Sequence, residues 1–440
     1  MFRILRYFFV SALLTLTAGS VCAQSVVTHK VKKNETIYGI ARENGITVDQ
    51  LIAANPGMEQ PGYTLKKGAV INVPVPSAIQ ASNATADVRQ RAIRLGVVLP
   101  LHDTNGDGRR MIEYYRGILM ACDSMKKEGI SVDVRAWNTP DGSDLSQVIN
   151  DPDAARCDII IGPLYTKQME TLSRFVSANN IKLVIPWSIS SPEVYVNSNI
   201  FQIYQQPTEQ MESTARRFSD WFAQSHPIIV DCDDPNSTKG AFTAVLRRQL
   251  ELKGVQYSLT SLKSTDANFA SAFSAACQNV LVLNSSRSDD LKVVFLKLKS
   301  LCAANPNLQV AVFGYQEWFS LYESLSAGFH KYNMHIPAPF YTNLGSAATQ
   351  KLSQQYRSYF HHDMQNNFPR FALAGFDHAV YFLRGLHKYG SAFDGAAGRF
   401  GYQPVQTPLK FERAGNGGYL NRSFMFVHYK SDNLIETINY

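Results

Sequence analysis

The chain has 440 residues, of which 45% are hydrophobic and 11% are aromatic. This composition is sufficient for packed cores and excludes a disordered chain, and the length suggests two or three domains. The formal net charge of +7 is small for this length and gives no reason to expect a nucleic-acid-binding protein.

Residues 1–23 have the pattern of a secretory signal peptide. Arg3 and Arg6 supply the positive start, and the apolar run 7–16 follows them. A membrane-spanning helix needs about 20 apolar residues, so this run is too short to be an anchor. We expect cleavage after Ala23 and a mature protein that acts in the periplasm.

Cysteine usage leaves two questions open. Acylation of Cys22 is an alternative to simple cleavage, although Val21 stands where a lipoprotein signal normally has a small residue. The five cysteines that remain after cleavage are Cys122, Cys157, Cys232, Cys277 and Cys302. An odd number leaves at least one thiol unpaired in an oxidising compartment. None has metal-ligand spacing, so we expect small buried hydrophobic residues, and their pairing stays open.

Residues 28–74 predict a compact unit in the order strand, helix, helix, strand. A short strand at 29–31 is followed by a helix through 37–41, where apolar residues recur at helical spacing. Thr47 and Gln50 form a capping box that opens the second helix. The run 70–74 supplies the final strand.

The segments HKVKKNETIYGIA at 29–41, GITVDQLIAANP at 45–56 and LKKGAVINVP at 65–74 resemble a LysM module from end to end. This resemblance implies a module at residues 26–74 that binds N-acetylglucosamine-containing chains, such as peptidoglycan, in a shallow groove between two loops. Carried over to this sequence, the loop residues are Asn34, Glu35, Thr36 and Ile37, and Asn55, Pro56, Gly57 and Met58. Glu35 and Thr36 are also suited to capping the first helix, and the two roles are compatible.

Residues 75–92 are rich in Ala, Ser, Asn and Gln and predict a linker. From residue 93 onward, short apolar strands alternate with helices, and the alternation occurs twice. The expected strands are 93–99, 132–137, 158–161, 182–185 and 200–204, then 227–231, 255–259, 280–283, 309–313 and 339–341. The strongest expected helices are 111–122, 168–179, 242–250 and 372–389. Residues 93–440 therefore predict an α/β fold with two doubly wound lobes built on parallel sheets.

Three motifs in this region, IGPLYT at 161–166, IPWSISSPE at 185–193 and AGFDHAV at 374–380, resemble type I periplasmic binding proteins. That family includes branched-chain amino acid receptors, which clamp a small solute between two lobes. Their first lobe holds the solute carboxylate with hydroxyl and backbone N–H groups. Carried over, Thr166 and Ser190 would be these donors, with Ser188 nearby. The same three side chains are equally suited to capping helices and loops.

The resemblance fails in part of the second lobe. Amino-acid receptors hold the solute ammonium there with an aromatic residue and an acid. The matching strand ends are 284–286, which lacks the aromatic residue, and 314–317, where Glu317 could stand in for the acid.

We find no catalytic, metal-binding or cofactor-binding motif. Residues 103–108 imitate a calcium loop, but Glu113 lies one position before the place of the bidentate ligand. The adjacent side chains of 361–363 do not converge on a helix. We therefore expect no enzyme, no cofactor and no metal.

The sequence thus predicts an exported, wall-associated protein. The LysM module would bind peptidoglycan or a related glycan and tether the larger domain to the cell wall. That domain would be a non-catalytic interaction or regulatory module for cell-wall machinery, with a cell-wall synthesis protein as partner. The alternative is a solute receptor for a small polar ligand, such as an amino acid or a muropeptide.

Overall fold

The computed structural model describes residues 26–33, 35–44, 48–60, 63–74, 87–142, 144–188, 191–395 and 402–440. They form two compact units, and the second begins at Asp87. We call residues 26–74 the first unit and Asp87–Tyr440 the second unit. The expected signal peptide and residues 75–86 of the expected linker lie outside the described residues.

The second unit starts with a short 3-10 helix, η2 (Val88–Gln90), whose Val88 is buried in the core. Residues 87–92, which the linker prediction included, are therefore part of this unit. Among the described residues, no helix combines the length and the apolar character needed to cross a membrane.

The first unit confirms the predicted order of elements. Its elements are β1 (Val26–Lys30), α1 (Ile37–Glu43), α2 (Val48–Ala53), the 3-10 helix η1 (Pro56–Glu59) and β2 (Val70–Pro74). β1 and β2 pair antiparallel. Ile40 and Leu51 are fully buried between the helices and the strands, at the positions where the apolar period predicts the core. Gly45 and Thr47, which the sequence places at the junction of the two helices, lie outside the described residues.

The second unit contains two sheets of seven strands each, with orders β13-β14-β7-β6-β5-β3-β4 and β16-β15-β12-β11-β10-β8-β9. We call the parts built on these sheets the first lobe and the second lobe. The first-lobe strands are β3 (Ile93–Leu99), β4 (Val132–Asn138), β5 (Ile159–Ile161), β6 (Lys182–Ile185), β7 (Ile200–Gln202), β13 (Phe411–Arg413) and β14 (Tyr419–Asn421). The second-lobe strands are β8 (His226–Asp231), β9 (Ser258–Ser261), β10 (Asn279–Leu283), β11 (Val310–Phe313), β12 (His335–Ala338), β15 (Met425–Tyr429) and β16 (Ile435–Asn439).

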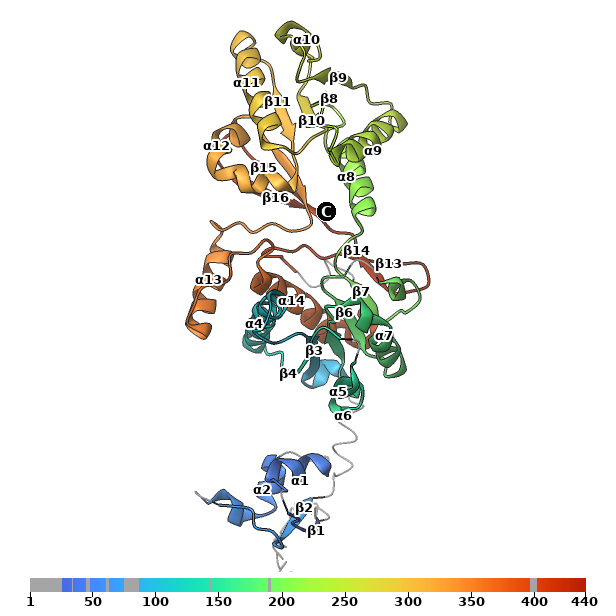
Figure 1. The fold of residues 1–440 in the computed structure, drawn as a ribbon, viewed down its shortest axis with the longest axis vertical. Coiled ribbons are helices and arrows are strands. Elements are labelled where there is room, and N and C mark those ends of the chain that lie inside the picture. The colour runs from blue at the N-terminus through green and yellow to red at the C-terminus, as the bar shows by residue number, and fades with distance from the viewer. Residues whose placement is uncertain are drawn as a thin grey trace, which may run out of the picture. The chain divides into compact units, whose positions relative to one another are not determined.

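Helices cover both faces of each sheet. In the second lobe, α8 and α9 lie on one side of the strands and α11 and α12 on the other, and in the first lobe α4 and α14 lie opposite α7 (Figure 1). The helices are α4 (Gly106–Lys127), α5 (Ser146–Ile149), α6 (Pro152–Ala155), α7 (Met169–Ala178), α8 (Pro207–Trp221), α9 (Lys239–Leu252), α10 (Asp266–Ala270), α11 (Ser288–Ala304), α12 (Tyr322–Lys331), α13 (Ala347–Phe360) and α14 (Phe371–Tyr389). The short 3-10 helices are η3 (Thr166–Gln168), η4 (Pro192–Tyr195), η5 (Gln316–Leu321) and η6 (Gly390–Ala392). The predicted two-lobed α/β architecture is confirmed.

The parallel centre of each sheet is extended by antiparallel strands near the C-terminus of the chain. β13 pairs antiparallel with β14, and β15 pairs antiparallel with both β12 and β16. The prediction of a strand at residues 339–341 is wrong. The strand in this region is β12, which ends at Ala338. Its sequence contains His335 and Pro337, so it did not stand out as an apolar run.

The strand expected at residues 255–259 begins later, at Ser258. The N–H of Val255 donates to the carbonyl of Leu250 at 2.9 Å and completes the end of α9. Val255 therefore belongs to the helix end, because the hydrogen bonds that close a helix reach past its last turn.

Alternate residues of the first-lobe strands belong to different cores. Val97, Ile159 and Ile161 pack with α4 and α14, whereas Val98 and Ile160 pack with α7. Successive side chains of a strand point to opposite faces of the sheet. A strand covered on both faces therefore reads as an uninterrupted apolar run, which is why these strands could be predicted.

The chain passes between the lobes after β7, after β12 and after β14. We call residues 203–206, 339–343 and 422–424 the three crossings. The second crossing leads to α13, which packs on the first lobe: the Tyr356 hydroxyl donates to the buried carboxylate of Glu113 on α4.

Helices α4 and α14 approach each other closely enough for their backbones to touch. A Cβ atom added at Gly117 of α4 would collide with the carbonyl oxygen of Ala372, and one added at Gly375 of α14 would collide with that of Tyr114. The two glycines face this contact from opposite sides. They are required here because there is no room for a side chain.

Gly117→Ala should destabilise the second unit, since the added methyl group forces the two helices apart. Overpacking of this kind costs about 1–3 kcal/mol of unfolding free energy. The matched control is Gly240→Ala in α9, where an added Cβ meets no atom within 4 Å. Urea unfolding of both variants checks the prediction, and equal midpoints would contradict it.

Candidate functional site

The first predicted glycan-binding loop of the first unit is ordered by its own side chains. The Glu35 carboxylate accepts hydrogen bonds from the Lys32 backbone N–H at 2.7 Å and from His29 Nε2 at 2.8 Å. The hydrogen bond from His29, with that of Lys32, lowers the pKa of Glu35. Thr36 Oγ1 accepts the Gly39 N–H at 3.0 Å and so caps α1. Asn34 lies outside the described residues.

The second predicted loop is tied to β2 by one amide side chain. Asn55 Nδ2 donates to the carbonyl of Asn72 at 2.6 Å, and Asn55 Oδ1 accepts the Asn72 N–H at 2.8 Å. Met58 is only 7% exposed and lies in one hydrophobic cluster with Ile37 of the first loop. The apolar members of the two loops are thus brought together, and the amide positions the second loop.

Pro56 and Gly57 form the exposed part of the second loop. No atom lies within 4 Å of a Cβ added at Gly57, so the space beside this backbone is open to a ligand. Exposed backbone N–H and C=O groups next to a small apolar surface are what an N-acetyl group requires.

In the first lobe of the second unit, two predicted hydroxyls meet. Thr166 Oγ1 and Ser188 Oγ are 3.3 Å apart at the carboxyl ends of the neighbouring parallel strands β5 and β6. Thr166 is exposed and Ser188 is buried. Ser190 lies outside the described residues. This pair is suited to donating hydrogen bonds to an anion at the end of a parallel sheet.

Glu317 lies in the second lobe and pairs with Lys239 Nζ at 2.6 Å. The neighbouring Tyr315 is buried, and its hydroxyl donates to the carbonyl of Leu283. Lys239 Nζ also lies 4.8 Å from the centre of the Tyr315 ring. The acid and the aromatic ring of this strand end are therefore engaged with groups of their own lobe, and no described contact joins them to Thr166 or Ser188.

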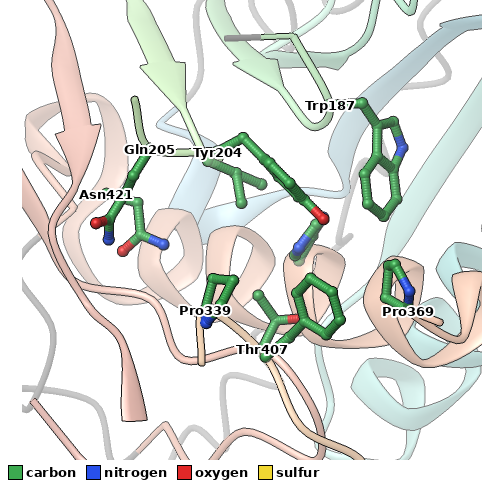
Figure 2. A pocket seen from close by; sticks show the side chains of 10 residues that line it. Trp187, Tyr204, Gln205, Pro339, Pro369, Thr407 and Asn421 are labelled. Carbon is green, nitrogen blue, oxygen red and sulfur yellow. The ribbon is translucent and has the colours of Figure 1, made fainter. Parts of the chain in front are cut away.

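One pocket of the second unit lies at the first and second crossings and not at these hydroxyls. Figure 2 shows its wall, to which Trp187 of the first lobe, Tyr204 of the first crossing and Pro339 of the second crossing contribute. The wall is made of Trp187, Ile203, Tyr204, Gln205, Pro339, Phe340, Pro369, His378, Thr407 and Asn421. Its volume of about 10 Å³ holds a single water molecule. It is too small in this structure for an amino acid.

A buried histidine of α14 lines this pocket. His378 Nδ1 and the Tyr114 hydroxyl are 2.8 Å apart. Burial lowers the pKa of His378 to about 3 and raises that of Tyr114, so both groups are neutral at physiological pH. His378 Nε2, on the other side of the ring, is buried and has no hydrogen-bond partner among the described residues.

Asp377, the next residue toward the N-terminus of α14, holds the loop that completes the pocket. Its carboxylate accepts the backbone N–H groups of Val405, Gln406 and Thr407 at 2.9, 2.7 and 2.8 Å. Gln406 Oε1 in turn accepts the hydroxyl of Thr342 in the second crossing at 2.6 Å. The carboxylate thus positions a loop that holds one of the three crossings.

Trp187 and Asp377 lie in the motifs that carry the family resemblance, yet the sequence did not mark them as site residues. The residue types themselves could have marked them, since a Trp and an Asp inside otherwise apolar motifs need hydrogen-bond partners. The partners come from distant segments that no local pattern links to them.

The five cysteines of the second unit are all free thiols. Among the described residues, no group of His, Cys, Asp and Glu is placed to hold a metal ion.

Burial raises the pKa of Asp377 from 3.8 to about 7 against the opposing effect of three backbone N–H donors. Between these two values the folded protein keeps a proton that the unfolded chain has lost. The unfolding free energy contributed by Asp377 therefore falls as the pH rises through this window.

Asp377→Asn removes this titration and turns one amide N–H group toward a backbone N–H group. The unpaired donors lower the unfolding free energy by about 1–3 kcal/mol. We expect the stability difference between wild type and variant to shrink from about pH 4 to about pH 8. Denaturant unfolding across this range measures it, with exposed Asp289→Asn as the control. A constant difference would contradict the raised pKa.

Comparisons with known proteins agree with both parts of the chain. Residues 29–74 match the family model of the LysM domain. A comparison with curated protein sequences finds no match.

Among solved structures, a putative branched-chain amino acid ABC transporter protein from Rhodospirillum rubrum is 15% identical, with a TM-score of 0.50 over 79% of this chain and 100% of that chain. LpoA from Haemophilus influenzae is 15% identical, with a TM-score of 0.48 over 80% of this chain and 59% of that chain. A leucine complex of an ABC transporter substrate-binding protein from Desulfitobacterium hafniense is 13% identical, with a TM-score of 0.40 over 79% of this chain and 100% of that chain. At such identities the likeness concerns the fold alone. The fold assignment rests on the Rhodospirillum rubrum structure. Residues 29–74 are thus a LysM domain, and the second unit has the fold of type I periplasmic binding proteins.

Proposed function

We propose that this protein is exported, binds peptidoglycan or a related N-acetylglucosamine glycan through its first unit, and acts at the cell wall. The match of residues 29–74 to the LysM family carries this proposal. The open backbone at Pro56 and Gly57, beside the Ile37 and Met58 cluster, supplies the chemistry that an N-acetyl group needs. Asn34, Glu35 and Thr36 complete the proposed glycan site.

We propose further that the second unit is a non-catalytic module that contacts a protein of the cell-wall machinery. The strand end at 284–286 lacks the aromatic residue that would hold a solute ammonium, and the expected acid, Glu317, is paired with Lys239. The pocket at the crossings is nearly filled by side chains. Both observations favour a protein partner over a small solute.

An exposed aromatic ring at the crossings also supports a protein contact. Phe368 is 56% exposed, and its ring is held 4.8 Å from that of Phe340 and 5.7 Å from that of Phe319. Aromatic side chains with a fixed position are enriched where proteins contact one another. Phe319 comes from the second lobe and Phe368 from the first, so a partner bound here would contact both lobes.

A solute receptor is the second candidate function, and the Thr166 and Ser188 pair favours it. Two hydroxyls 3.3 Å apart at the ends of parallel strands could hold a carboxylate. With Ser190 and Glu317, they are the proposed ligand residues if the lobes close on an amino acid or a muropeptide.

A pull-down on purified peptidoglycan tests the tether. The full chain should sediment with the polymer, and Asp87–Tyr440 alone should stay in the supernatant, because the glycan site lies in the first unit. Equal sedimentation of the two proteins would overturn the assignment of wall binding to the LysM domain. Release of glycan fragments during the incubation would show a hydrolase instead.

Thermal unfolding with added amino acids and muropeptides separates the two roles of the second unit. A ligand that binds only the folded state raises the melting temperature. We expect no rise, because Glu317, the acid that would hold a solute ammonium, is paired with Lys239. A rise of several degrees that Thr166→Ala abolishes would establish the solute receptor and reject the interaction module.

A further inference from the structure

Five exposed lysines gather at one end of the first unit. They are Lys30, Lys32, Lys33, Lys66 and Lys67, and we call them the lysine cluster. Residues far apart in the sequence meet here because Val31 pairs with the turn before β2. The Val31 N–H donates to the carbonyl of Ala69, and the Gly68 N–H donates to the carbonyl of Val31, both at 2.8 Å.

The local backbone turns these side chains away from the core. Val31 is 3% exposed, so its neighbours Lys30 and Lys32 point outward, as the alternation of an extended chain requires. In the turn, the Ala69 N–H donates to the carbonyl of Lys66 at 3.1 Å, and Gly68 takes a φ of 86° that glycine adopts readily. The turn therefore presents Lys66 and Lys67 at its tip, beside the lysines that flank Val31.

The charge of the cluster is not neutralised within the described part of the first unit. None of the five ammonium groups forms an ion pair there, and the described ion pair of this unit joins Glu35 to His29. The Glu35 carboxylate accepts hydrogen bonds from His29 and from the Lys32 backbone N–H. An exposed group of five like charges creates a local field that attracts an anion, and salt screens it.

The lysine cluster borders the proposed glycan site. Lys32 and Lys33 begin the loop that continues through Glu35, Thr36 and Ile37, so a glycan chain held by that loop passes next to the ammonium groups. Peptidoglycan carries peptides with carboxylates along its glycan chains, whereas chitin has the same N-acetylglucosamine units and no such charge.

We propose that the lysine cluster binds peptide carboxylates of peptidoglycan and makes the first unit prefer peptidoglycan to neutral N-acetylglucosamine polymers. This inference rests on the proposed function, since the glycan site must first hold the chain. The glycan site supplies affinity for the sugar, and the cluster supplies a salt-dependent preference for the charged polymer.

The test compares the full chain with a variant in which Lys32, Lys33, Lys66 and Lys67 are all changed to Gln. The control variant carries the same charge change on exposed lysines of the second unit. These control substitutions are Lys126→Gln, Lys299→Gln, Lys351→Gln and Lys410→Gln. Binding is measured by sedimentation with peptidoglycan, with peptidoglycan whose carboxylates have been converted to neutral amides, and with chitin.

At low salt the wild type and the control should bind peptidoglycan at least about fivefold more tightly than the amidated polymer, as several exposed ion pairs together would give. The cluster variant should lose this difference and bind chitin as the wild type does, which also shows that its first unit is folded. The difference should vanish near 0.5 M salt, where the screening length is only about 4 Å.

Equal binding of the wild type to native and amidated peptidoglycan would overturn the inference, and so would unchanged peptidoglycan binding by the cluster variant. In both cases chitin binding would leave the proposed function intact. Failure of the wild type to bind either glycan would overturn the proposed function itself. Cluster-dependent binding to anionic phospholipid vesicles, without sensitivity to amidation, would assign the lysines to a membrane surface and reject the carboxylate proposal.

Discussion

The contact between α4 and α14 is the constraint on which the second unit depends. Gly117 and Gly375 let the two helix backbones touch, and this fixes the position of α14 in the first lobe. α14 then presents Asp377 and His378 at the crossings: Asp377 holds the loop at 405–407, and His378 lines the pocket. A shift of the helix pair would move both groups together. Helix packing inside the first lobe therefore positions the loop that holds the second crossing.

The same arrangement limits what can bind between the lobes. Side chains from the first and second crossings line the pocket there, and Glu317 and the Tyr315 hydroxyl have partners within the second lobe. In the first lobe, the hydroxyls of Thr166 and Ser188 lie 3.3 Å apart. The fold is thus that of type I periplasmic binding proteins, while Glu317 and the Tyr315 hydroxyl are engaged within the second lobe. This is the physical basis for favouring a protein partner.

In the first unit, a few side chains order the two loops of the proposed glycan site. Thr36 caps α1, Glu35 orders its loop through His29, and Asn55 fixes the second loop to β2. Side chains in these loops therefore act mainly to position backbone and apolar surface. The side chains of the lysine cluster beside these loops form no described contact that positions a loop.

By itself, the sequence determined the order of elements in the first unit and the apolar central strands of the second unit, because the apolar period of a helix and the apolar runs of strands such as β3 and β6 are local properties. It also determined the LysM domain, whose motifs span the whole unit. Only the tertiary structure decided the antiparallel strands β15 and β16, the pairing of Glu317 with Lys239, and the loop held by Asp377. Each of these joins segments far apart in the chain, so their partners depend on packing that no local pattern records.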